Sequence, residues 1–459
     1  MLRQCIASFL GLLAVVTGTI LQNGQVRITN FPDTKIDLSS YMLETYDANA
    51  TEVSYKGRWD SKKISWWSAP GLVFGFTGDT VAITFGRETI DTTLVGYRLG
   101  GMDWQFTNVT TGGTHLLINS ETMGVNLTYP VNPKTLELRV TNWGYGVQID
   151  KIHVAAGEKL IGIPNYRRSI EFIGDSLSAG MYTSYEGLSS FAYGVGAGLG
   201  ETEYSVTAIP GICVADQNCW GNPRGQVHQW FYASDTSGRA TKIWGDNPEP
   251  WDFSKQQSPD IVVINLGTND NNEANNVTSE AYADSYKKLI QGVHGKFPNA
   301  QVVVMQLWLG FFQYGNSYAQ NHGFDTELLG VVDYFNSDEY LLSPIIWDGT
   351  TNTTTTLNST SQPFVHFFNT TGIMQHNDIG PQWHPTDTGA IKVASHLTQY
   401  IRLKFGWDLQ ATGPEYTTPS PDDEIRVGFW DLLHGYLVLT AGTLRIFHET
   451  LYWNDEPNY

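Results

Sequence analysis

Residues 170–178 read Ile170-Glu171-Phe172-Ile173-Gly174-Asp175-Ser176-Leu177-Ser178. The apolar residues are typical of a buried strand, which ends in Gly-Asp-Ser before a turn of small residues. This pattern predicts that the Ser176 hydroxyl lies at the carboxyl edge of a sheet, where open α/β folds bind their ligands. The same segment therefore predicts both a fold class and the position of a site.

Apolar strands alternate with helical periods from this segment onward, over residues 166–408. Residues 261–266 and 301–305 are continuous apolar runs of the kind found in parallel sheets that are covered on both faces, and residues 364–368 resemble another. Apolar residues at helical spacing are Tyr282, Tyr286, Leu289, Ile290 and Val293, and later Ala390, Val393, Ala394, Leu397 and Ile401. This alternation predicts βαβ units and an α/β domain.

Residues 25–165 show a different pattern, with short alternating or β-branched segments separated by Gly, Asn, Asp and Pro. Examples are residues 81–85, 93–97, 136–140 and 147–152. Strand spacing of this kind predicts a β-sandwich or jelly roll. Residues 409–459 contain a linker-like stretch, Gly413 to Pro421, and an apolar segment, 429–447, that is a poor membrane span; we assign this tail no function.

Residues 1–20 resemble a secretory signal peptide. Arg3 supplies the positive start, Cys5 to Val16 is a short apolar core, and Thr17-Gly18 lie near a plausible cleavage point. The alternative is a membrane anchor, but the apolar run is shorter than the roughly 20 residues that a span requires. We therefore expect a secreted, extracellular protein. Seven Asn-x-Ser/Thr sequons suggest a glycosylating eukaryotic source: Asn49, Asn108, Asn126, Asn276, Asn352, Asn358 and Asn369.

Two cysteines, Cys213 and Cys219, remain once the leader is removed. In an exported chain they are expected to form a disulfide, with a catalytic thiol as the alternative. The net charge of −19 disfavours nucleic acid and anionic membrane as partners and suits a neutral substrate. The sequence has no His or Cys pairs at metal-ligand spacing and no Gly-x-Gly-x-x-Gly phosphate loop after a strand, so we expect no metal and no cofactor.

A serine nucleophile needs a neighbouring base, and His384 is the candidate base for Ser176. Because Pro385 disfavours helix at the residue before it, His384 is expected on a loop just before the last helix. Other interpretations are a helix N-cap for Ser176 and a hydrogen-bonded loop histidine for His384.

Acyl transfer also needs hydrogen-bond donors for the developing oxyanion. Asn269, after the strand at 261–266, could offer its side-chain amide, and Gly211 could offer its N–H beside the N–H of Ser176. The alternatives are a turn asparagine and an ordinary loop glycine.

The order Ser176, Gly211, Asn269, His384 resembles the SGNH or GDSL hydrolases over residues 166–405. That resemblance implies a three-layer, flavodoxin-like α/β domain in which Ser176 is the nucleophile. It also implies that Gly211 and Asn269 are oxyanion donors and His384 is the base.

The preceding β domain, with Gly57-Arg58-Trp59 and Trp66-Trp67-Ser68-Ala69-Pro70-Gly71, is similar to that of the family-two carbohydrate esterases, which extends the resemblance to residues 40–405. It implies an acetylesterase that acts on acetylated polysaccharide or oligosaccharide such as xylan or glucomannan. We expect it to be a monomer.

One departure concerns the residue that orients the base. Many SGNH enzymes carry an aspartate two or three residues before the histidine, where this chain has Gln382 and Pro381. The resemblance then implies a Ser–His dyad in which a backbone carbonyl orients the imidazole. Asp387 and Asp378 are the rival candidates for this role.

Trp308 and Trp383 are weak candidates for stacking against sugar rings, since each could instead lie in the core. Two other functions remain open. One is a lipid or other small-ester esterase of the same superfamily, and the other is a carbohydrate-binding protein with an inactive hydrolase domain.

Overall fold

The computed structural model describes residues 21–22, 25–26, 31–122, 127, 133–358 and 362–411. All of them fall within one compact unit, Met1–Glu415, and a second unit, Tyr416–Tyr459, lies outside the described residues. Strands β1 (Leu21–Gln22) and β2 (Gln25–Val26) form a short antiparallel pair. The leader at 1–20, the sequon at Asn126 and most of the tail at 409–459 also lie outside the described residues.

The amino-terminal part is a β-sandwich. One sheet has the order β3-β10-β7-β12-β4, and the other has the order β9-β8-β11-β6, with β5 and β13 also paired to β6. Pairing within both sheets is antiparallel, as the short alternating segments predict. The strands are β3 (Lys35–Ile36), β4 (Leu43–Asp47), β5 (Ser54–Trp59), β6 (Ser65–Phe76), β7 (Val81–Phe85), β8 (Thr93–Leu99), β9 (Gln105–Val109), β10 (Thr114–Ile118), β11 (Lys134–Val140), β12 (Ile149–Ala155) and β13 (Leu160–Ile161).

The second part is built on a parallel sheet in the order β15-β14-β16-β17-β22. Its strands are β14 (Arg168–Gly174), β15 (Thr202–Ala208), β16 (Ile261–Asn265), β17 (Gln301–Met305) and β22 (Val365–Phe368). Numbered along the chain, this is the flavodoxin-like order 2-1-3-4-5, whose topological switch point lies between the first and third strands, β14 and β16. The predicted fold class, an all-β sandwich followed by a three-layer α/β domain, is therefore confirmed.

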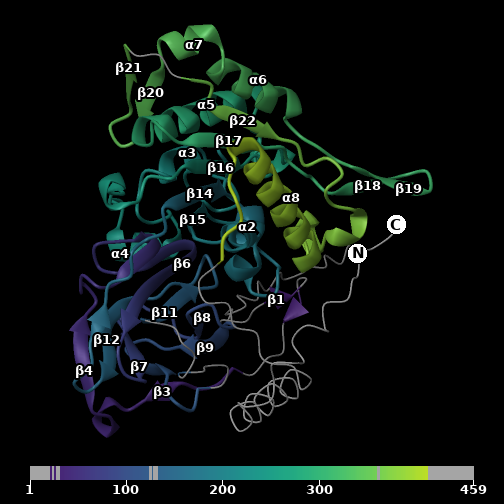
Figure 1. The fold of residues 1–459 in the computed structure, drawn as a ribbon. Coiled ribbons are helices and arrows are strands. Elements are labelled where there is room, and N and C mark those ends of the chain that lie inside the picture. Colours follow the sequence, from purple (N-terminus) through teal and green to yellow (C-terminus); the bar gives the residue numbers. More distant parts are fainter. Residues whose placement is uncertain are drawn as a thin grey trace, which may run out of the picture. The chain divides into compact units, whose positions relative to one another are not determined.

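Helices cover both faces of the parallel sheet (Figure 1). Alternate residues of β16 point to opposite faces: Ile261 and Val263 pack with α2 and α8, whereas Val262 and Ile264 pack with α5 and α6. The helices are α1 (Ser176–Ala179), α2 (Phe191–Leu199), α3 (Gln226–Gln229), α4 (Gly238–Trp244), α5 (Ser279–Lys296), α6 (Asp325–Phe335), α7 (Asp338–Leu342) and α8 (Asp387–Phe405). Two hairpins, β18 (Phe311–Tyr314) with β19 (Ser317–Gln320) and β20 (Ile345–Asp348) with β21 (Thr353–Thr356), complete the domain.

The sandwich and the α/β part share a buried junction. Strand β6 meets β15 where Ser68 pairs with Val206, and Trp67 Nε1 donates to Ala233 O at 2.8 Å. The sandwich tryptophans Trp59, Trp66 and Trp67 are buried, as expected for core residues. At the far end of the domain, Gln410 N donates to Leu199 O at 2.8 Å, so the first residues of the predicted tail pair with the end of α2. None of the helices that the structure describes has the length and apolarity needed to span a bilayer.

Candidate active site

Ser176 is the first residue of α1, directly after β14. The N-cap of this helix is Asp175, whose Oδ1 accepts the Leu177 N–H at 3.0 Å, so the Ser176 hydroxyl is not used as a cap. Ser176 is 5% exposed. A Cβ on Gly174 would lie 2.0 Å from Ser178 Oγ, so only glycine allows the strand to end against this turn.

Asn269 and Asp270, which follow β16, connect two neighbouring segments. These are the loop from Gly211 to Trp220 (the glycine loop) and the turn from Gly174 to Ser178 (the serine turn). Asn269 Nδ2 donates to Ile212 O at 2.9 Å and lies 3.5 Å from Asp175 Oδ2. Asp270 accepts the N–H groups of Val214 and Ala215 at 2.9 and 3.0 Å. The side chains of Asn269 and Asp270 thus link the segment after β16 to the loop after β15 and to Asp175, which follows β14.

Gly211 lies in the same loop with a φ of 79°, in the left-handed region that favours glycine. Added there, a Cβ would approach Trp220 Cβ to 2.9 Å. The N–H groups of Gly211 and Ser176 donate to no acceptor among the described residues. Both are therefore available as oxyanion donors, whereas one N–H of the Asn269 amide is already used by Ile212 O.

The predicted disulfide is present: Cys213 and Cys219 are joined, with their Cα atoms 5.9 Å apart. The disulfide closes the loop from Cys213 to Cys219. Asp270 accepts the N–H groups of Val214 and Ala215 in the same loop. The alternative of a catalytic thiol is therefore wrong for this structure.

Two buried carboxyls, those of Asp175 and Asp270, adjoin Ser176 and Asn269 in the chain. Burial, with a contribution from neighbouring Asp270, raises the pKa of Asp175 to about 7. Burial also raises the pKa of Asp270 to about 6, although the two backbone N–H groups that it accepts work against the shift. The surroundings of Asp175 and Asp270 are thus a low-dielectric environment, in which hydrogen bonds to a developing charge are stronger than in water.

The His384 ring is oriented by the main chain. Its Nδ1 lies 2.9 Å from the carbonyl oxygen of Gln382. A carbonyl can only accept, so Nδ1 carries the proton and Nε2 is left as the basic nitrogen. Gln382 and Trp383 both have positive φ, 52° and 66°, and this unusual turn brings the carbonyl back toward the ring.

His384 is 8% exposed, and its Nε2 is buried without a hydrogen-bond partner among the described residues. Burial lowers the pKa of His384 below 6.5, while the carbonyls of Gln382 and Pro381 oppose the shift. Ser176 Oγ and His384 Nε2 are therefore not hydrogen bonded in this state. Catalytic hydrogen bonds are often long in unliganded enzymes and tighten only once substrate binds.

Contacts from the segment after α1 bring the serine and histidine loops together. The Tyr182 ring lies edge-to-face with the His384 ring, with centroids 5.1 Å apart and planes at 88°. Ser184 N donates to Asp387 Oδ1 at 2.8 Å, and Ser184 Oγ donates to Oδ2. Asn269 thus links the loop of Gly211 to Asp175, the residue before Ser176. Tyr182 and Ser184 link the segment after α1 to the loop of His384.

Neither rival carboxylate contacts His384. Asp387 is used by Ser184, and Asp378 binds Lys392 Nζ at 2.9 and 2.7 Å and the Gln375 N–H at 2.8 Å. The carboxylate alternatives for the orienting group are therefore wrong in this structure.

Aromatic side chains near the site divide into core and surface. Trp308 is 0% exposed and packs in the core against Phe191, so it cannot stack against a sugar, and that suggestion is wrong. Trp383 is 55% exposed and lies over Gly310. Trp220, which the sequence analysis missed, is 58% exposed beside Gly211. Its position directly after Cys219 in a short surface loop is the sequence signal that could have identified it.

Five predicted sequons are exposed: Asn49, Asn276, Asn352, Asn358 and Asn369. Asn108 is half-buried in β9. Within the described ranges, no cluster of three or more His, Cys, Asp or Glu side chains could hold a metal ion.

Comparison with known proteins finds similar sequences and folds for this part of the chain. Residues 172–390 match the model of the GDSL-like Lipase/Acylhydrolase family. No curated protein sequence matches the chain.

Among solved structures, a family two carbohydrate esterase from Clostridium thermocellum in complex with cellohexaose is similar, with a TM-score of 0.56 and 22% identity over 77% of this chain and 99% of that one. An acetyl xylan esterase, Est2A, from the rumen bacterium Butyrivibrio proteoclasticus has a TM-score of 0.57 and 16% identity over 79% of this chain and 100% of that one. A carbohydrate esterase family 2 enzyme from Corynascus thermopiles (Myceliophthora fergusii) has a TM-score of 0.54 and 19% identity over 77% of this chain and 100% of that one. Residues 172–390 therefore resemble the GDSL-like lipase/acylhydrolase family, and the sandwich with its α/β part has the two-part fold of the solved family-two carbohydrate esterases.

Proposed function

We propose that this chain is a secreted serine esterase that removes O-acetyl groups from plant cell-wall polysaccharide such as xylan or glucomannan. The observation that carries the proposal is the state of His384. Its Nδ1 is hydrogen bonded to a carbonyl, its Nε2 is buried without a partner among the described residues, and its ring contacts Tyr182, three residues after α1. A buried, partnerless basic nitrogen is costly unless a substrate or nucleophile uses it.

The proposed reaction is acyl transfer in two stages. Nε2 of His384 takes the proton from Ser176 Oγ while that oxygen bonds to the acetyl carbonyl carbon. The carbonyl oxygen becomes an oxyanion, which accepts hydrogen bonds from the N–H groups of Ser176 and Gly211. The Asn269 amide, once it turns away from Asp175, donates its second N–H to the same oxygen. The C–O bond to the sugar then breaks, and His384 returns the proton to the sugar oxygen. Water, deprotonated by His384, releases acetate by the same route.

The substrate class is inferred from the fold neighbours and from the surface of the site. One neighbour is a complex with cellohexaose, and another is an acetyl xylan esterase. Trp383 beside the base and Trp220 beside Gly211 offer exposed aromatic faces on which sugar rings can stack. The acidic chain, of net charge −19, favours a neutral polymer over an anionic surface.

Secretion is supported by the signal-like residues 1–20, by the disulfide and by the exposed sequons. Treating the secreted protein with an endoglycosidase tests this part of the proposal. A mass decrease is expected, and a chain that stays inside the cell would contradict it.

The direct test of activity is acetate release from acetylated xylan, acetylated glucomannan and p-nitrophenyl acetate by the native chain and by Ser176→Ala. The substitution removes only the hydroxyl, so the folded protein should keep its thermal unfolding temperature and lose hydrolysis to the background rate. Hydrolysis that survives in folded Ser176→Ala would refute the assignment.

A lipid or other small-ester esterase is the second candidate, and one observation favours it. A groove of about 860 Å³ between α2 and α8, lined in part by Leu188, Ala390 and Ile391, begins at Asp387, near the base. Rates with acetyl and long-chain p-nitrophenyl esters separate the candidates: the proposed deacetylase should prefer acetyl. An inactive carbohydrate-binding protein would not react with a fluorophosphonate at Ser176, whereas the esterase should be labelled.

A further inference from the structure

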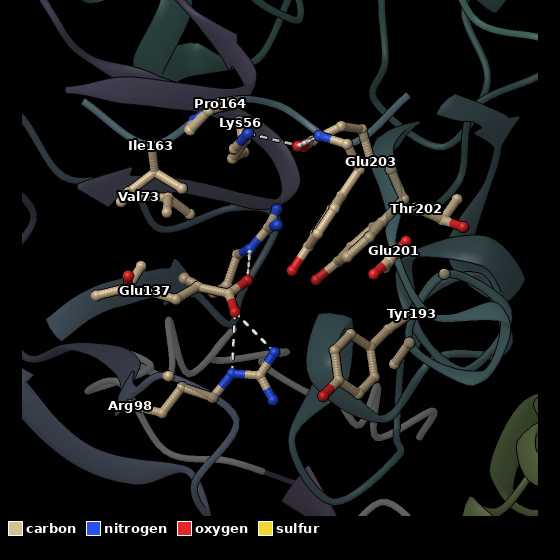
Figure 2. A pocket seen from close by; sticks show the side chains of 17 residues that line it. Lys56, Val73, Arg98, Glu137, Ile163, Pro164, Tyr193, Glu201, Thr202 and Glu203 are labelled. Atoms are coloured by element: carbon tan, nitrogen blue, oxygen red, sulfur yellow. Dashed lines mark hydrogen bonds and ion pairs between the residues drawn. The ribbon is translucent and has the colours of Figure 1, made fainter. Parts of the chain in front are cut away.

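A cavity of about 140 Å³ lies between the sandwich and the α/β part (Figure 2). Its lining does not include Ser176. Strands β8 and β11 form one wall, and the start of β15 with α2 forms the other. Tyr204 is near the amino end of β15, whereas Gly211 follows its carboxyl end, so up to roughly 20 Å of strand separates the cavity from the oxyanion loop. This cavity is therefore not the candidate active site.

Five of the six charged groups of the cavity are paired with one another. Glu137 accepts Arg98 through Nε at 2.9 Å and Nη2 at 2.7 Å, and its other oxygen accepts Arg139 Nε at 2.9 Å. On the opposite side, Lys56 Nζ lies 2.8 Å from Glu203 Oε2 (Figure 2). With Glu201, the lining has three cations and three anions. The lining is polar but carries no net charge, so it does not select an ion of either sign.

One polar group of the lining has no partner. The Tyr204 hydroxyl is buried and makes no hydrogen bond within the described part of the chain. Its ring is held in place, because Arg139 Cζ lies 4.4 Å from the ring centroid and the Tyr193 ring packs against it at 5.9 Å. A buried hydroxyl held rigidly without a partner is unfavourable unless a bound molecule or water satisfies it.

We propose that this cavity is a second, non-catalytic binding site for one neutral sugar unit. Its volume of about 140 Å³ equals that of roughly five water molecules. Together with the cavity of about 250 Å³ that shares Lys56, Glu203 and Tyr204 with it, it has room for a single pyranose ring. Sugar hydroxyls both donate and accept, so they can bond to Tyr204 Oη and to the outer atoms of the paired Arg and Glu groups. The faces of Tyr193 and Tyr204 supply apolar contact for the ring. The choice of sugar as ligand rests in part on the proposed function.

Neighbouring space allows the ligand to belong to a longer chain. Lys56, Glu203 and Tyr204 also line a second cavity of about 250 Å³. A glycan held at this junction would keep polymer close to the enzyme between turnovers and raise the local concentration of acetylated units.

The test uses the full chain carrying Ser176→Ala, titrated with methyl xyloside, methyl glucoside, methyl mannoside and sodium glucuronate by ligand-observed NMR. At least one neutral glycoside should bind. Adding Tyr204→Phe, which removes only the unpartnered hydroxyl, should weaken that binding roughly three- to tenfold, as expected for the loss of one hydrogen bond. The sugar-free Tyr204→Phe protein should unfold at the same or a higher temperature, because no protein hydrogen bond is lost.

Tyr400→Phe is the matched control, since it deletes a tyrosine hydroxyl on α8 that donates to Phe367 O at 3.4 Å. It should leave glycoside affinity unchanged. The proposal is overturned if no neutral glycoside binds, if only glucuronate binds, or if Tyr204→Phe binds as tightly as its parent.

Hydrolysis of p-nitrophenyl acetate separates this site from the proposed function. Tyr204→Phe in the chain with Ser176 intact should hydrolyse the ester at the native rate. Tyr204-dependent sugar binding by a chain that hydrolyses no ester would refute the esterase and leave the sugar site standing. Ester hydrolysis by a chain whose sugar binding does not depend on Tyr204 would refute the sugar site and leave the esterase standing.

Discussion

Among single residues, His384 shows most clearly how the backbone can replace a side chain. A carboxylate beside an imidazole would both orient the ring and stabilise its protonated form. The Gln382 carbonyl fixes the same tautomer but carries no full charge, so burial prevails and lowers the pKa of His384. A base with a lowered pKa is weaker, but it stays unprotonated further into the acid range.

The first prediction concerns pH. The base acts when neutral, so activity is complete above the pKa of His384 and is lost as pH falls through it. Because burial lowers this pKa from 6.5, the acid limb of kcat/KM for p-nitrophenyl acetate should have its midpoint below pH 6.5. A midpoint at or above that value would contradict a buried, carbonyl-bonded base.

The second prediction tests the turn before the base. Gln382→Gly keeps the carbonyl and tolerates the φ of 52°, so kcat should change little. Gln382→Val places a β-branched residue in a left-handed conformation that it tolerates less well than glutamine. The turn should shift, and kcat should fall about tenfold for each roughly 1.4 kcal/mol of added strain.

Asp387→Asn provides the contrast within the same loop. If a carboxylate oriented the ring, this change would reduce kcat by about 10⁴, as in a Ser-His-Asp triad. Since Asp387 binds Ser184 instead, we expect a loss of less than tenfold. A loss on the triad scale, measured on folded protein, would restore the carboxylate.

At the level of elements, strands were easier to predict than the glycine-rich helix and the hairpins. The apolar runs at β16 and β17 and the periodic faces of α5 and α8 follow from burial, and the structure confirms them. Helix α2 contains Gly194, Gly196 and Gly198, and no helical pattern is visible in that stretch of sequence because glycine disfavours helix. Packing explains why one of these glycines stands in the helix. A Cβ on Gly196 would lie 2.6 Å from the Tyr204 side chain.

Sequence order predicted the four candidate residues but not how their segments are joined. The contacts Asn269–Ile212, Asp270–Val214 and Tyr182–His384 link residues far apart in the chain, and no local pattern encodes them. The exposure of Trp220 and the burial of Trp308 likewise depend on the packed neighbours. The roles of Ser176, Gly211, Asn269 and His384 stay predictions until the variants are measured.

The third prediction concerns the loop from Gly211 to Trp220. Cys213→Ser with Cys219→Ser opens a bridge of sequence separation 6, which should lower the free energy of unfolding by about 2 kcal/mol. Asp270 still holds Val214 and Ala215, so the protein should fold, but kcat should fall because the Gly211 N–H is held less firmly. Treating the native chain with reductant should reproduce the loss, and equal activity with and without the bridge would show that Asp270 alone positions the loop.

For the molecule as a whole, Arg58 connects the two parts of the fold. It projects from β5 of the sandwich, and its Nη1 donates to the carbonyls of Trp230 and Tyr232 in the α/β part. Its Nη2 lies 3.2 Å from Glu171 on β14, and both side chains are almost fully buried. Because such contacts span the junction, residues 31–411 should unfold in one cooperative transition in calorimetry.

The last prediction follows from how Glu171 is satisfied. Besides Arg58, Glu171 accepts Trp230 Nε1 at 2.8 Å, Thr207 Oγ1 at 3.0 Å and Gln256 Nε2 at 2.9 Å. Arg58→Met removes the only cation that contacts this buried carboxylate within the described residues, so stability should fall by about 3–5 kcal/mol. Glu171→Gln in the same chain removes the charge that was left unpaired, so the double variant should recover part of the loss. If the double variant is no more stable than Arg58→Met, packing of the arginine against Trp230, Trp251 and Phe253 is what holds the two parts together, and not its charge.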